Sequence, residues 1–327
     1  MRQRRLGTTG LYVSHLALGT MGWGRDTDGE DAGNQLRTFL DAGGNLVDTA
    51  NVYVDGESEQ ILGRLLGGAV ARDEVIVATK AGLRRGEERD RDASRRHLLD
   101  ALDESLKRLN TDHVDIWQMH QWDPRTPLEE TLAALDTAVA SGRTRYVGIS
   151  NYSGWQTARA ATWQKAWPGR APIIATQMEY SLLQRGIERE VVPAAQSLGV
   201  GILAWSPIGR GVLTGKYQSG TPADSRGASR DYGNFIRPYL DDRASRIVGS
   251  VLAAADGLGV SPLAIALAWV RDRPGVVAPV IGARNTAQLR VSLEADSTVL
   301  PEEIRSALDD VSAPEMSYPE APPPLGR

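Results

Sequence analysis

Short apolar runs rich in β-branched residues recur along the chain, and segments with helical spacing lie between them. The runs cover residues 15–20, 45–50, 74–80, 113–120, 145–151, 172–177, 200–206 and 277–282. Uninterrupted apolar runs of this length are typical of parallel strands buried on both faces. The segments 33–43, 58–66, 95–110, 127–142 and 189–199 repeat apolar residues at helical spacing. The pattern therefore predicts alternating strands and helices.

Most of the eight predicted strands begin roughly 30 residues apart, which is the length of one βαβ unit. Eight such units predict an α/β fold of the (β/α)₈ TIM barrel type. The alternative is a doubly wound open sheet, which usually has fewer strands and a GxGxxG fingerprint after the first one. The segment 16–24 does not match that fingerprint. The barrel is therefore favoured.

We expect a single barrel domain over residues 1–327, with an N-terminal hairpin at 1–12 and a Pro-rich C-terminal tail at 313–327. The interval before the eighth strand is much longer than the others. It contains residues 209–235, a stretch rich in Gly, Ser, Thr and Asp, before helical spacing resumes at 243–259 and 261–272. A loop of this length after the seventh strand of a barrel is typical of a functional segment.

The composition excludes several kinds of site. The chain of 327 residues has no cysteine, and its four histidines show neither HxxxH nor HxH spacing, so we expect no thiolate chemistry and no metal site. A net charge of −4 gives no field that would hold nucleic acid. No apolar stretch is long enough to span a membrane, and the charged N-terminus lacks the apolar region of a signal peptide. We therefore expect no membrane partner and a cytoplasmic location.

Reactive side chains end three consecutive predicted strands. Asp48 and Tyr53 follow the second strand, Lys80 ends the third and His120 ends the fourth. Each has a structural alternative: a cap, a loop aromatic, a solvated charge or a satisfied polar group. Active sites of barrels lie at the carboxyl ends of the strands, however, and lysine occurs only at positions 80, 107, 165 and 216. The combination therefore predicts a catalytic site.

These four residue types suit the reduction of a carbonyl group. A free tyrosine has a pKa of about 10 and is a poor proton donor at neutral pH. A lysine ammonium about 4 Å away contributes about 4 kcal/mol at an effective dielectric of 20, which would bring the phenol pKa near 7. Asp48 would keep Lys80 charged, and His120 would hydrogen-bond the carbonyl oxygen. Tyr53 is then the predicted general acid.

The chain resembles the aldo-keto reductases over nearly its full length. The resemblance rests on DTANVY (48–53) with Lys80 and His120, and on GISN (148–151), ATQMEYSLL (175–183), AWSPIGRGVLTGKY (204–217) and GARNTAQL (282–289). It is similar to the branch that includes the potassium-channel β subunits. The resemblance implies a barrel that binds NADPH or NADP⁺ without a Rossmann domain and acts on a small-molecule carbonyl substrate.

The resemblance also implies which residues contact the cofactor. Ser150, Asn151 and Gln177 would bind the carboxamide, and the face of Trp205 would stack on the nicotinamide. Arg284 would meet the ribose 2′-phosphate and Gln288 the adenine, while Lys216 and Arg226 would meet the pyrophosphate. Arg226 has a second interpretation as a solvated loop charge. The remaining expected contacts are Thr20, Met21, Ser206, Pro207, Ile208, Gly209, Gly211, Gly282 and Ser292.

The residues themselves support part of this assignment. The segment 209–216 does not have the spacing of a P-loop, and Tyr217 stands where a magnesium-ligating Ser or Thr would be needed. It is better explained as a flexible clamp whose backbone amides meet phosphate. Gly282 opens a predicted helix N-terminus, which suits a phosphate. Ser292 departs from the family, which usually has Asn there, so adenine binding is the weaker part of the assignment.

Several tryptophans and one charged run also allow predictions. Trp23 and Trp122 follow strand ends, and we expect them to line the substrate pocket. The three tryptophans of 155–169 fall near one helix face, and we expect them to pack. The mixed-charge run 83–96 is expected to be a solvated loop leading into a helix.

Two functional alternatives remain beside carbonyl reduction. The first is a non-catalytic NADP-binding regulatory subunit, against which His120 argues because weakly active relatives tend to lose that residue. The second is a Schiff-base enzyme with Lys80 as nucleophile, which leaves Asp48 and Tyr53 without a purpose. Neither the physiological substrate nor the oligomeric state follows from the sequence.

Overall fold

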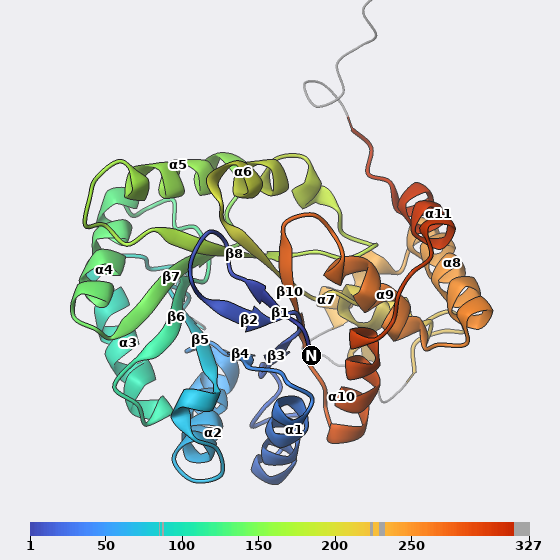
Figure 1. Ribbon diagram of the computed structural model, residues 1–327, viewed down its shortest axis with the longest axis horizontal. Coiled ribbons are helices and arrows are strands. Elements are labelled where there is room, and N and C mark those ends of the chain that lie inside the picture. Colours follow the sequence, from blue (N-terminus) through green and yellow to red (C-terminus); the bar gives the residue numbers. More distant parts are fainter. Residues whose placement is uncertain (85, 87, 223–224, 229–232, 317–327) are drawn as a thin grey trace, which may run out of the picture.

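The fold is a closed barrel of eight parallel strands (Figure 1), seen in a computed structural model that describes residues 1–84, 86, 88–222, 225–228 and 233–316. The strands follow each other around the barrel in the order β10-β3-β4-β5-β6-β7-β8-β9. Their bounds are β3 (Ala17–Gly19), β4 (Leu46–Asp48), β5 (Ile76–Ala81), β6 (Val114–Met119), β7 (Thr144–Ser150), β8 (Ile173–Glu179), β9 (Gly201–Trp205) and β10 (Val276–Ile281). The predicted TIM barrel is therefore confirmed.

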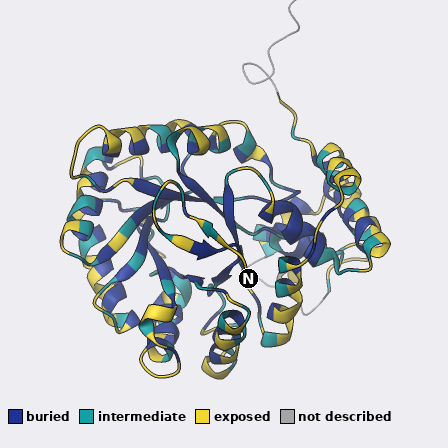
Figure 2. Cartoon of the chain, viewed as in Figure 1, coloured by how far each residue is buried: buried dark blue, intermediate teal, exposed yellow. Residues whose placement is uncertain are grey.

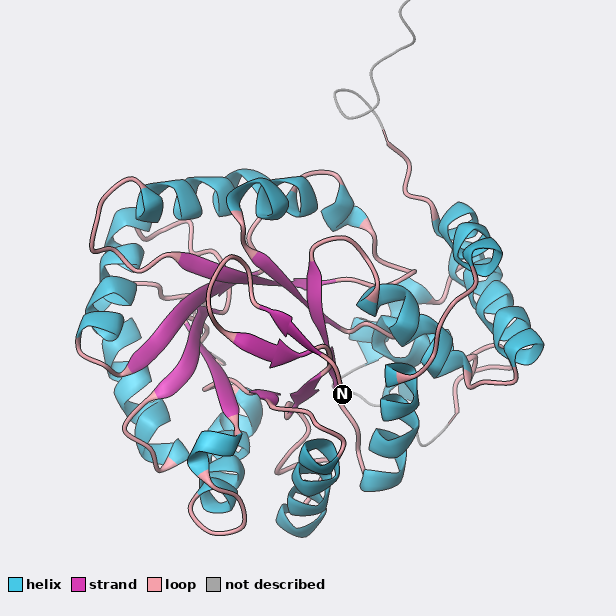
Figure 3. Ribbon diagram, in the orientation of Figure 1, coloured by secondary structure: helices cyan, strands magenta, loops and turns pink. Residues whose placement is uncertain are grey.

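Helices lie around the barrel (Figure 3). They are α1 (Gly29–Asp41), α2 (Glu57–Leu66), α3 (Arg95–Leu109), α4 (Leu128–Ala140), α5 (Gly154–Lys165), α6 (Val191–Leu198), α7 (Gly233–Ile236), α8 (Asp242–Leu258), α9 (Pro262–Arg271), α10 (Thr286–Leu293) and α11 (Glu302–Ser312). Helices α8 and α11 pack against each other at one side of the barrel. Short 3₁₀ turns are η1 (Tyr53–Gly56), η2 (Arg72–Glu74), η3 (Gly186–Glu188), η4 (Gly209–Thr214), η5 (Arg226–Ala228), η6 (Arg237–Tyr239) and η7 (Glu294–Asp296).

Local sequence explains where a helix such as α3 starts and stops. The Ser94 side chain accepts a hydrogen bond from the backbone N–H of His97 and caps the first turn. Asn110 ends the helix in a left-handed conformation with φ of 50°, a position that Gly or Asn occupies readily. These two polar residues fix the length of the helix between the strands β5 and β6.

An antiparallel hairpin of β1 (Gln3–Arg5) and β2 (Tyr12–Ser14) covers one end of the barrel. Leu6 and Val13 are fully buried in the same cluster as inward-facing strand residues such as Ile116. The hairpin extends to Ser14, slightly beyond the expected 1–12. Because it closes the amino end of the strands, the end that stays open is the carboxyl end.

The three tryptophans of residues 155–169, two on α5 and Trp167 just after it, do not form a buried face as predicted. Trp155, Trp163 and Trp167 are 55%, 37% and 62% exposed, and the outer faces of the helices are likewise exposed in Figure 2. The helix packs inward through small residues, since Ala160 and Ala161 are fully buried. The indoles therefore lie on the outer side, and the expectation of a packed face was wrong.

The charged run after β5 is anchored by ion pairs rather than fully solvated. Arg89 Nη2 lies 3.1 Å from Asp92 Oδ1 and 3.3 Å from Asp123 Oδ2, and Arg84 Nη1 lies 3.5 Å from Asp92 Oδ2. Asp123 belongs to the following loop, after β6, and is buried. The two neighbouring loops are thus tied together at the open end of the barrel.

Helices α8 and α9 are consecutive and apolar. Within the described part of the chain, no single helix is long and apolar enough to cross a membrane; these two satisfy the length and composition together, but a bend of 103° separates them. Residues 317–327, most of the predicted Pro-rich tail, lie outside the described residues.

Candidate active site

Lys80 stands at the centre of the predicted catalytic group. Its Nζ donates hydrogen bonds to Asp48 Oδ2 (2.6 Å), to the Thr49 carbonyl (2.8 Å) and to the Tyr53 hydroxyl (3.3 Å). The neighbouring parallel strands β4 and β5 place Asp48 and Lys80 at the same end of the barrel. Lys80 is fully buried and Asp48 is 2% exposed. The structure therefore brings three of the four predicted residues into direct contact.

The buried ion pair keeps the lysine charged. Burial by itself would lower the pKa of Lys80, because it disfavours the ammonium. The Asp48 carboxylate and Tyr53 outweigh that effect and raise the pKa of Lys80 above its ordinary value. A buried, ion-paired ammonium is a poor nucleophile, since a Schiff base needs an accessible neutral amine. The arrangement therefore does not support the Schiff-base alternative.

A strained turn positions Tyr53. The 3₁₀ turn η1 that begins at Tyr53 contains Val54 and Asp55 with φ of 47° and 53°. Positive φ is uncommon for any residue other than glycine and is a genuine outlier for a β-branched one such as Val54. Such strain persists where surrounding contacts over-determine the backbone, and it is frequent at active sites. Here it follows immediately on the residue whose hydroxyl meets Lys80.

His120 faces Tyr53 from the end of β6. The two rings meet edge to face, with centroids 6.0 Å apart and an interplanar angle of 80°. The backbone N–H of His120 donates to the Ala81 carbonyl (2.8 Å), and its own carbonyl accepts from Asn151 Nδ2 (3.0 Å). All four predicted catalytic residues thus lie together.

A large cavity opens at this end of the barrel and encloses about 780 Å³. Asp48, Tyr53 and His120 line it, and Lys80 lies beneath them. It is also lined by most of the residues predicted to contact a cofactor: Met21, Ser150, Asn151, Gln177, Trp205, Ser206, Pro207, Ile208, Gly211, Lys216, Gly282, Arg284, Gln288 and Ser292. A concave site of this volume with a few polar groups is typical of small-molecule binding.

Hydrogen bonds link the amide-bearing residues on one side of the cavity. Trp205 Nε1 donates to Asn151 Oδ1 (3.1 Å), and Asn151 Nδ2 donates to Ser150 Oγ (3.1 Å). Gln177 Nε2 donates to Asp48 Oδ1 (2.8 Å). Asn151 and Ser206 have φ of 57° and 52°, so backbone strain marks the ends of β7 and β9 as well.

Two further cationic residues, Lys216 and Arg284, line the cavity. Lys216 lies against Gly211, where a Cβ would come within 3.2 Å of the lysine Nζ. Arg284 precedes α10, and its backbone N–H donates to Gln288 Oε1 (3.0 Å). Ser292 is nearly buried, and its hydroxyl donates to the Gln288 carbonyl one turn earlier (3.1 Å). The Ser292 hydroxyl therefore bonds within its own helix.

Several predicted residues lie outside the cavity lining. Thr20 is fully buried, and its hydroxyl hydrogen-bonds Ser58 (2.7 Å). Gly209 lies against Leu183 rather than on the cavity surface. The side chain of Arg226 lies outside the described residues.

The two tryptophans expected in the substrate pocket also lie elsewhere. Trp23 is fully buried, and its Nε1 donates to Gln35 Oε1 (3.1 Å). Trp122 packs edge to face against Tyr152 and Trp155, with centroids 5.2 and 5.4 Å away. Neither lines the cavity, because each indole packs against other side chains instead. The expectation for both is corrected.

The apolar and aromatic walls of the cavity were not predicted from the sequence. Val52, Leu83, Arg210 and Phe235 line it. Val52 and Leu83 follow the strands that supply Asp48 and Lys80, so the rule that identified those two could have found them. Arg210 and Phe235 lie in and after the long loop that follows β9, where no periodicity gives their positions.

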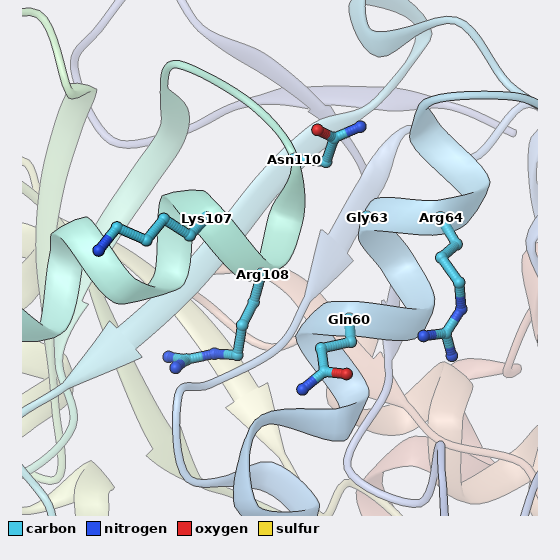
Figure 4. Close-up of a pocket in the computed structure, with 6 residues that line it drawn as sticks. All are labelled: Gln60, Gly63, Arg64, Lys107, Arg108 and Asn110. Atoms are coloured by element: carbon cyan, nitrogen blue, oxygen red, sulfur yellow. The ribbon is translucent and has the colours of Figure 1, made fainter.

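A smaller depression of about 410 Å³ lies on the outside of the barrel between α2 and α3. Its cationic side chains do not converge on one point (Figure 4). Each is paired with a carboxylate: Arg64 with Glu57 (3.0 Å), Lys107 with Glu104 (2.7 Å) and Arg108 with Glu59 (2.7 Å). This depression therefore has no chemistry comparable to that of the cavity.

Comparison with known proteins agrees with the geometry. The sequence model of the Aldo/keto reductase family matches residues 15–313. An uncharacterized oxidoreductase, YrpG, of Bacillus subtilis is 36% identical over 98% of this chain and 99% of its own. A probable voltage-gated potassium channel subunit beta of Oryza sativa is 35% identical over 98% of each chain. The L-glyceraldehyde 3-phosphate reductase of Escherichia coli is 35% identical over 90% of this chain and 87% of its own.

Proposed function

The chain belongs to the aldo/keto reductase family, and from this premise we propose that it reduces an aldehyde or ketone to an alcohol with NADPH, with Tyr53 as the general acid. The observation that carries the proposal is the buried ammonium of Lys80, which lies within hydrogen-bonding distance of both Asp48 and the Tyr53 hydroxyl. A cation in that position stabilises the phenolate that remains after proton donation.

The residues of the cavity fit a nicotinamide dinucleotide. Asn151 and Gln177 offer amide groups beside the ring of Trp205, which suits a flat carboxamide-bearing ring. Lys216 and Arg284 supply two cations in the lining of the same cavity, which suits a pyrophosphate and a 2′-phosphate. Bound NADPH would supply a hydride to the carbonyl carbon.

The protein's own groups would handle the proton. His120 donates a hydrogen bond to the carbonyl oxygen and orients it toward Tyr53. The Tyr53 hydroxyl transfers its proton to that oxygen as negative charge develops there. Lys80 stabilises the resulting phenolate, and Asp48 keeps Lys80 charged. Each of the four residues therefore has a separate role in the proton transfer.

A second candidate is a regulatory subunit that binds NADP without turnover. The relative from Oryza sativa whose name describes a potassium channel subunit favours it. The presence of His120 beside Tyr53 favours catalysis.

One assay separates the two. Purified protein is mixed with NADPH and a panel of aldehydes and ketones, and the near-ultraviolet absorbance of the cofactor is followed. Carbonyl-dependent loss of absorbance is expected. Tight NADPH binding with no turnover of any carbonyl would favour the regulatory subunit instead.

A further inference from the structure

Three hydroxyl side chains are buried together next to the catalytic group. Thr20 follows β3, Thr49 follows β4 and Ser58 lies in the first turn of α2. All three are fully buried, and none is among the described residues that line the cavity. The Ser58 hydroxyl lies 2.7 Å from Thr20 Oγ1 and 3.0 Å from Thr49 Oγ1. Three separate segments therefore meet at the hydroxyl of Ser58.

The geometry of these hydroxyls allows one continuous chain of hydrogen bonds. A hydroxyl has one proton to donate and accepts up to two hydrogen bonds. In such a chain Thr49 donates to Ser58, and Ser58 donates to Thr20, whose hydroxyl and carbonyl oxygens lie 2.7 and 2.9 Å away. The Thr20 hydroxyl in turn donates to the Asp48 carbonyl (3.2 Å). The chain therefore starts at Thr49 and returns to the residue before it.

The same backbone stretch holds Lys80. The Thr49 carbonyl accepts a hydrogen bond from Lys80 Nζ (2.8 Å). The backbone N–H of Thr49 donates to the Ala78 carbonyl on β5 (2.8 Å). Thr49 is thus held by β5 through its backbone and by Ser58 through its side chain, and its carbonyl is one of the three acceptors of the Lys80 ammonium.

Ser58 also closes the strained turn that carries Tyr53. Thr49 precedes this turn and Ser58 follows it, so the hydrogen bond between their hydroxyls joins the two ends of the segment 49–58. Val54, inside the turn, has φ of 47°. Strained backbone of this kind persists where surrounding contacts determine it, and the bond between the two hydroxyls is such a contact.

The next residue of α2 holds the neighbouring strand. Glu59 is fully buried; its Oε1 accepts from Thr79 Oγ1 (2.6 Å), and its Oε2 accepts from Arg108 Nε (2.7 Å). Thr79 directly precedes Lys80 on β5. The first turn of α2 therefore contacts β5 beside Lys80 and, through Ser58, the residues that follow β3 and β4.

Stability alone does not require hydroxyls at these three positions. A buried hydroxyl without a partner costs free energy, whereas replacing both partners by apolar groups of the same shape is nearly neutral. An apolar cluster would thus hold the segments together about as well. Hydrogen bonds add direction, because they weaken steeply when their geometry is distorted. The chain of hydroxyls therefore fixes orientation at a place where the orientation of a carbonyl matters.

We propose that Ser58 is a positioning residue for the proton transfer: its hydroxyl fixes the Thr49 carbonyl, and this carbonyl holds the Lys80 ammonium against Tyr53. The inference rests on the proposed role of Tyr53 as the general acid and adds to it a residue outside the described cavity lining.

The contact between Lys80 and Tyr53 is the one that should respond. At 3.3 Å it is the longest of the three hydrogen bonds that Lys80 Nζ donates. At an effective dielectric near 20, moving the ammonium about 1 Å farther from the phenol would raise the pKa of Tyr53 by roughly one unit. Among the described residues, Asp48 and His120 share the cavity with Tyr53. A variant of Ser58 leaves all these charged and titratable groups in the chain.

The test measures proton donation and phenol ionisation separately. The first readout is kcat/KM as a function of pH, with NADPH and benzaldehyde as the carbonyl probe. The second is the near-ultraviolet phenolate absorbance of each protein minus that of the same protein carrying Tyr53→Phe, which reports the ionisation of Tyr53 without turnover. Thermal melts and the NADPH dissociation constant report on the fold and on the cofactor site.

Four variants and one control are compared. Ser58→Ala removes the central hydroxyl. Thr49→Val keeps the shape and removes a hydroxyl, whereas Thr49→Ser keeps the hydroxyl. A triple variant combines Thr20→Val, Thr49→Val and Ser58→Ala. The control is Thr144→Val, because the buried Thr144 hydroxyl donates to the Tyr146 carbonyl (2.8 Å) at the other end of the barrel, where β7 begins.

Ser58→Ala and Thr49→Val should each raise the pKa of Tyr53 by roughly one unit. The basic limb of the pH profile should move to higher pH by the same amount, and kcat/KM at neutral pH should fall by roughly three- to tenfold. The NADPH dissociation constant should stay near that of the parent protein. Thr49→Ser should recover most of the rate and of the phenol pKa, and Thr144→Val should change neither.

The triple variant separates positioning from stability. Its melting temperature should exceed that of Ser58→Ala, because no buried hydroxyl of the group is left without its partner. The rate and the phenol pKa should stay shifted. If they returned to the parent values together with the stability, Ser58 would only support the fold and the inference would be wrong.

An unchanged Tyr53 pKa in Ser58→Ala would overturn the inference as well. If the triple variant fails to fold, the comparison of Thr49→Val with Thr49→Ser decides the matter. A parent protein that reduces no carbonyl would instead overturn the proposed function, and the phenol titration would still test whether Ser58 positions Lys80 against Tyr53.

Discussion

The side-chain amide of Gln177 donates a hydrogen bond of 2.8 Å to Oδ1 of Asp48. The other oxygen of Asp48 accepts from Lys80. Gln177, which is proposed to bind the nicotinamide carboxamide, is thus also hydrogen-bonded to Asp48, which belongs to the proposed proton-transfer site. Binding and catalysis are therefore coupled through one carboxylate.

Replacing Gln177 should affect both steps. In Gln177→Ala, Asp48 loses a donor to a buried charge, worth roughly 1.5 to 3 kcal/mol. We expect NADPH affinity to fall by about tenfold or more and kcat to fall as well. Fluorescence titration and steady-state kinetics measure the two effects separately.

Thr176→Val is the control on the same strand. The Thr176 hydroxyl is buried without a hydrogen-bond partner, so its removal should leave both quantities unchanged. A Gln177→Ala variant that loses cofactor affinity alone would show that Asp48 does not depend on this bond.

Removing Lys80 should cost stability as well as activity. Lys80→Met leaves the carboxylate of Asp48 buried without its partner, which typically destabilises a protein by about 3 to 5 kcal/mol. Adding Asp48→Asn removes that charge, so the double variant should regain much of the lost stability while activity stays low. Thermal melts and NADPH oxidation rates test this.

A double variant no more stable than Lys80→Met would contradict the ion-pair account. Trapping of a substrate adduct on Lys80 by borohydride in the parent protein would restore the Schiff-base alternative.

Arg284 should determine the preference for NADPH over NADH. A guanidinium makes charge-assisted hydrogen bonds to a 2′-phosphate, and NADH has no such group. Arg284→Ala should raise the dissociation constant of NADPH by about tenfold or more and change that of NADH little. Arg290→Ala, on the helix α10 that follows Arg284 but outside the cavity lining, is the control. Equal losses for the two cofactors would place the recognition of the phosphate elsewhere.

Asp123 should make stability depend on pH below neutrality. Burial would raise the pKa of Asp123, but hydrogen bonds from Thr126, from the backbone of Ala93 and Arg125, and from Arg89 outweigh it and lower the pKa to about 2. A carboxylate with a lowered pKa stabilises the fold above its unfolded pKa near 4 and loses that contribution as the pH falls toward 2.

The contribution is roughly 2 kcal/mol, so unfolding free energy should decline over this window. In Asp123→Asn the protein should be less stable at neutral pH, and the decline should be shallower. Denaturant titrations at several pH values measure it, with the exposed Asp112→Asn as control. Parallel pH profiles for the parent and Asp123→Asn would refute this role.

The strand ends could be predicted from the sequence because the rule that places them is local. Asp48, Lys80 and His120 each terminate a short apolar run, and parallel strands in a closed barrel bring their carboxyl ends to one opening. Contact among these residues then follows from topology. The catalytic centre of the site could therefore be predicted from the sequence.

The remaining parts of the site depend on long-range contacts that cannot be predicted from the spacing of residues along the chain. Phe235 reaches Trp205 through a long irregular segment, and Arg210 and Glu179 decide where it is held. The tryptophans at and after α5 illustrate this: Trp155 and Trp163 lie on the predicted helix, but Ala160 and Ala161 form the face that packs. The spacing of residue types shows that a helix has two faces of different composition. Close packing against the neighbouring side chains decides which of the two faces is buried.

The most direct test of the account is the turnover number of Tyr53→Phe, measured with NADPH and benzaldehyde beside its NADPH dissociation constant. The ring stays in place and only the proton donor is lost. The account predicts that kcat falls by roughly 10² or more while NADPH affinity stays nearly intact. A kcat within about threefold of the parent, at unchanged cofactor affinity, would contradict the role of Tyr53 as the general acid.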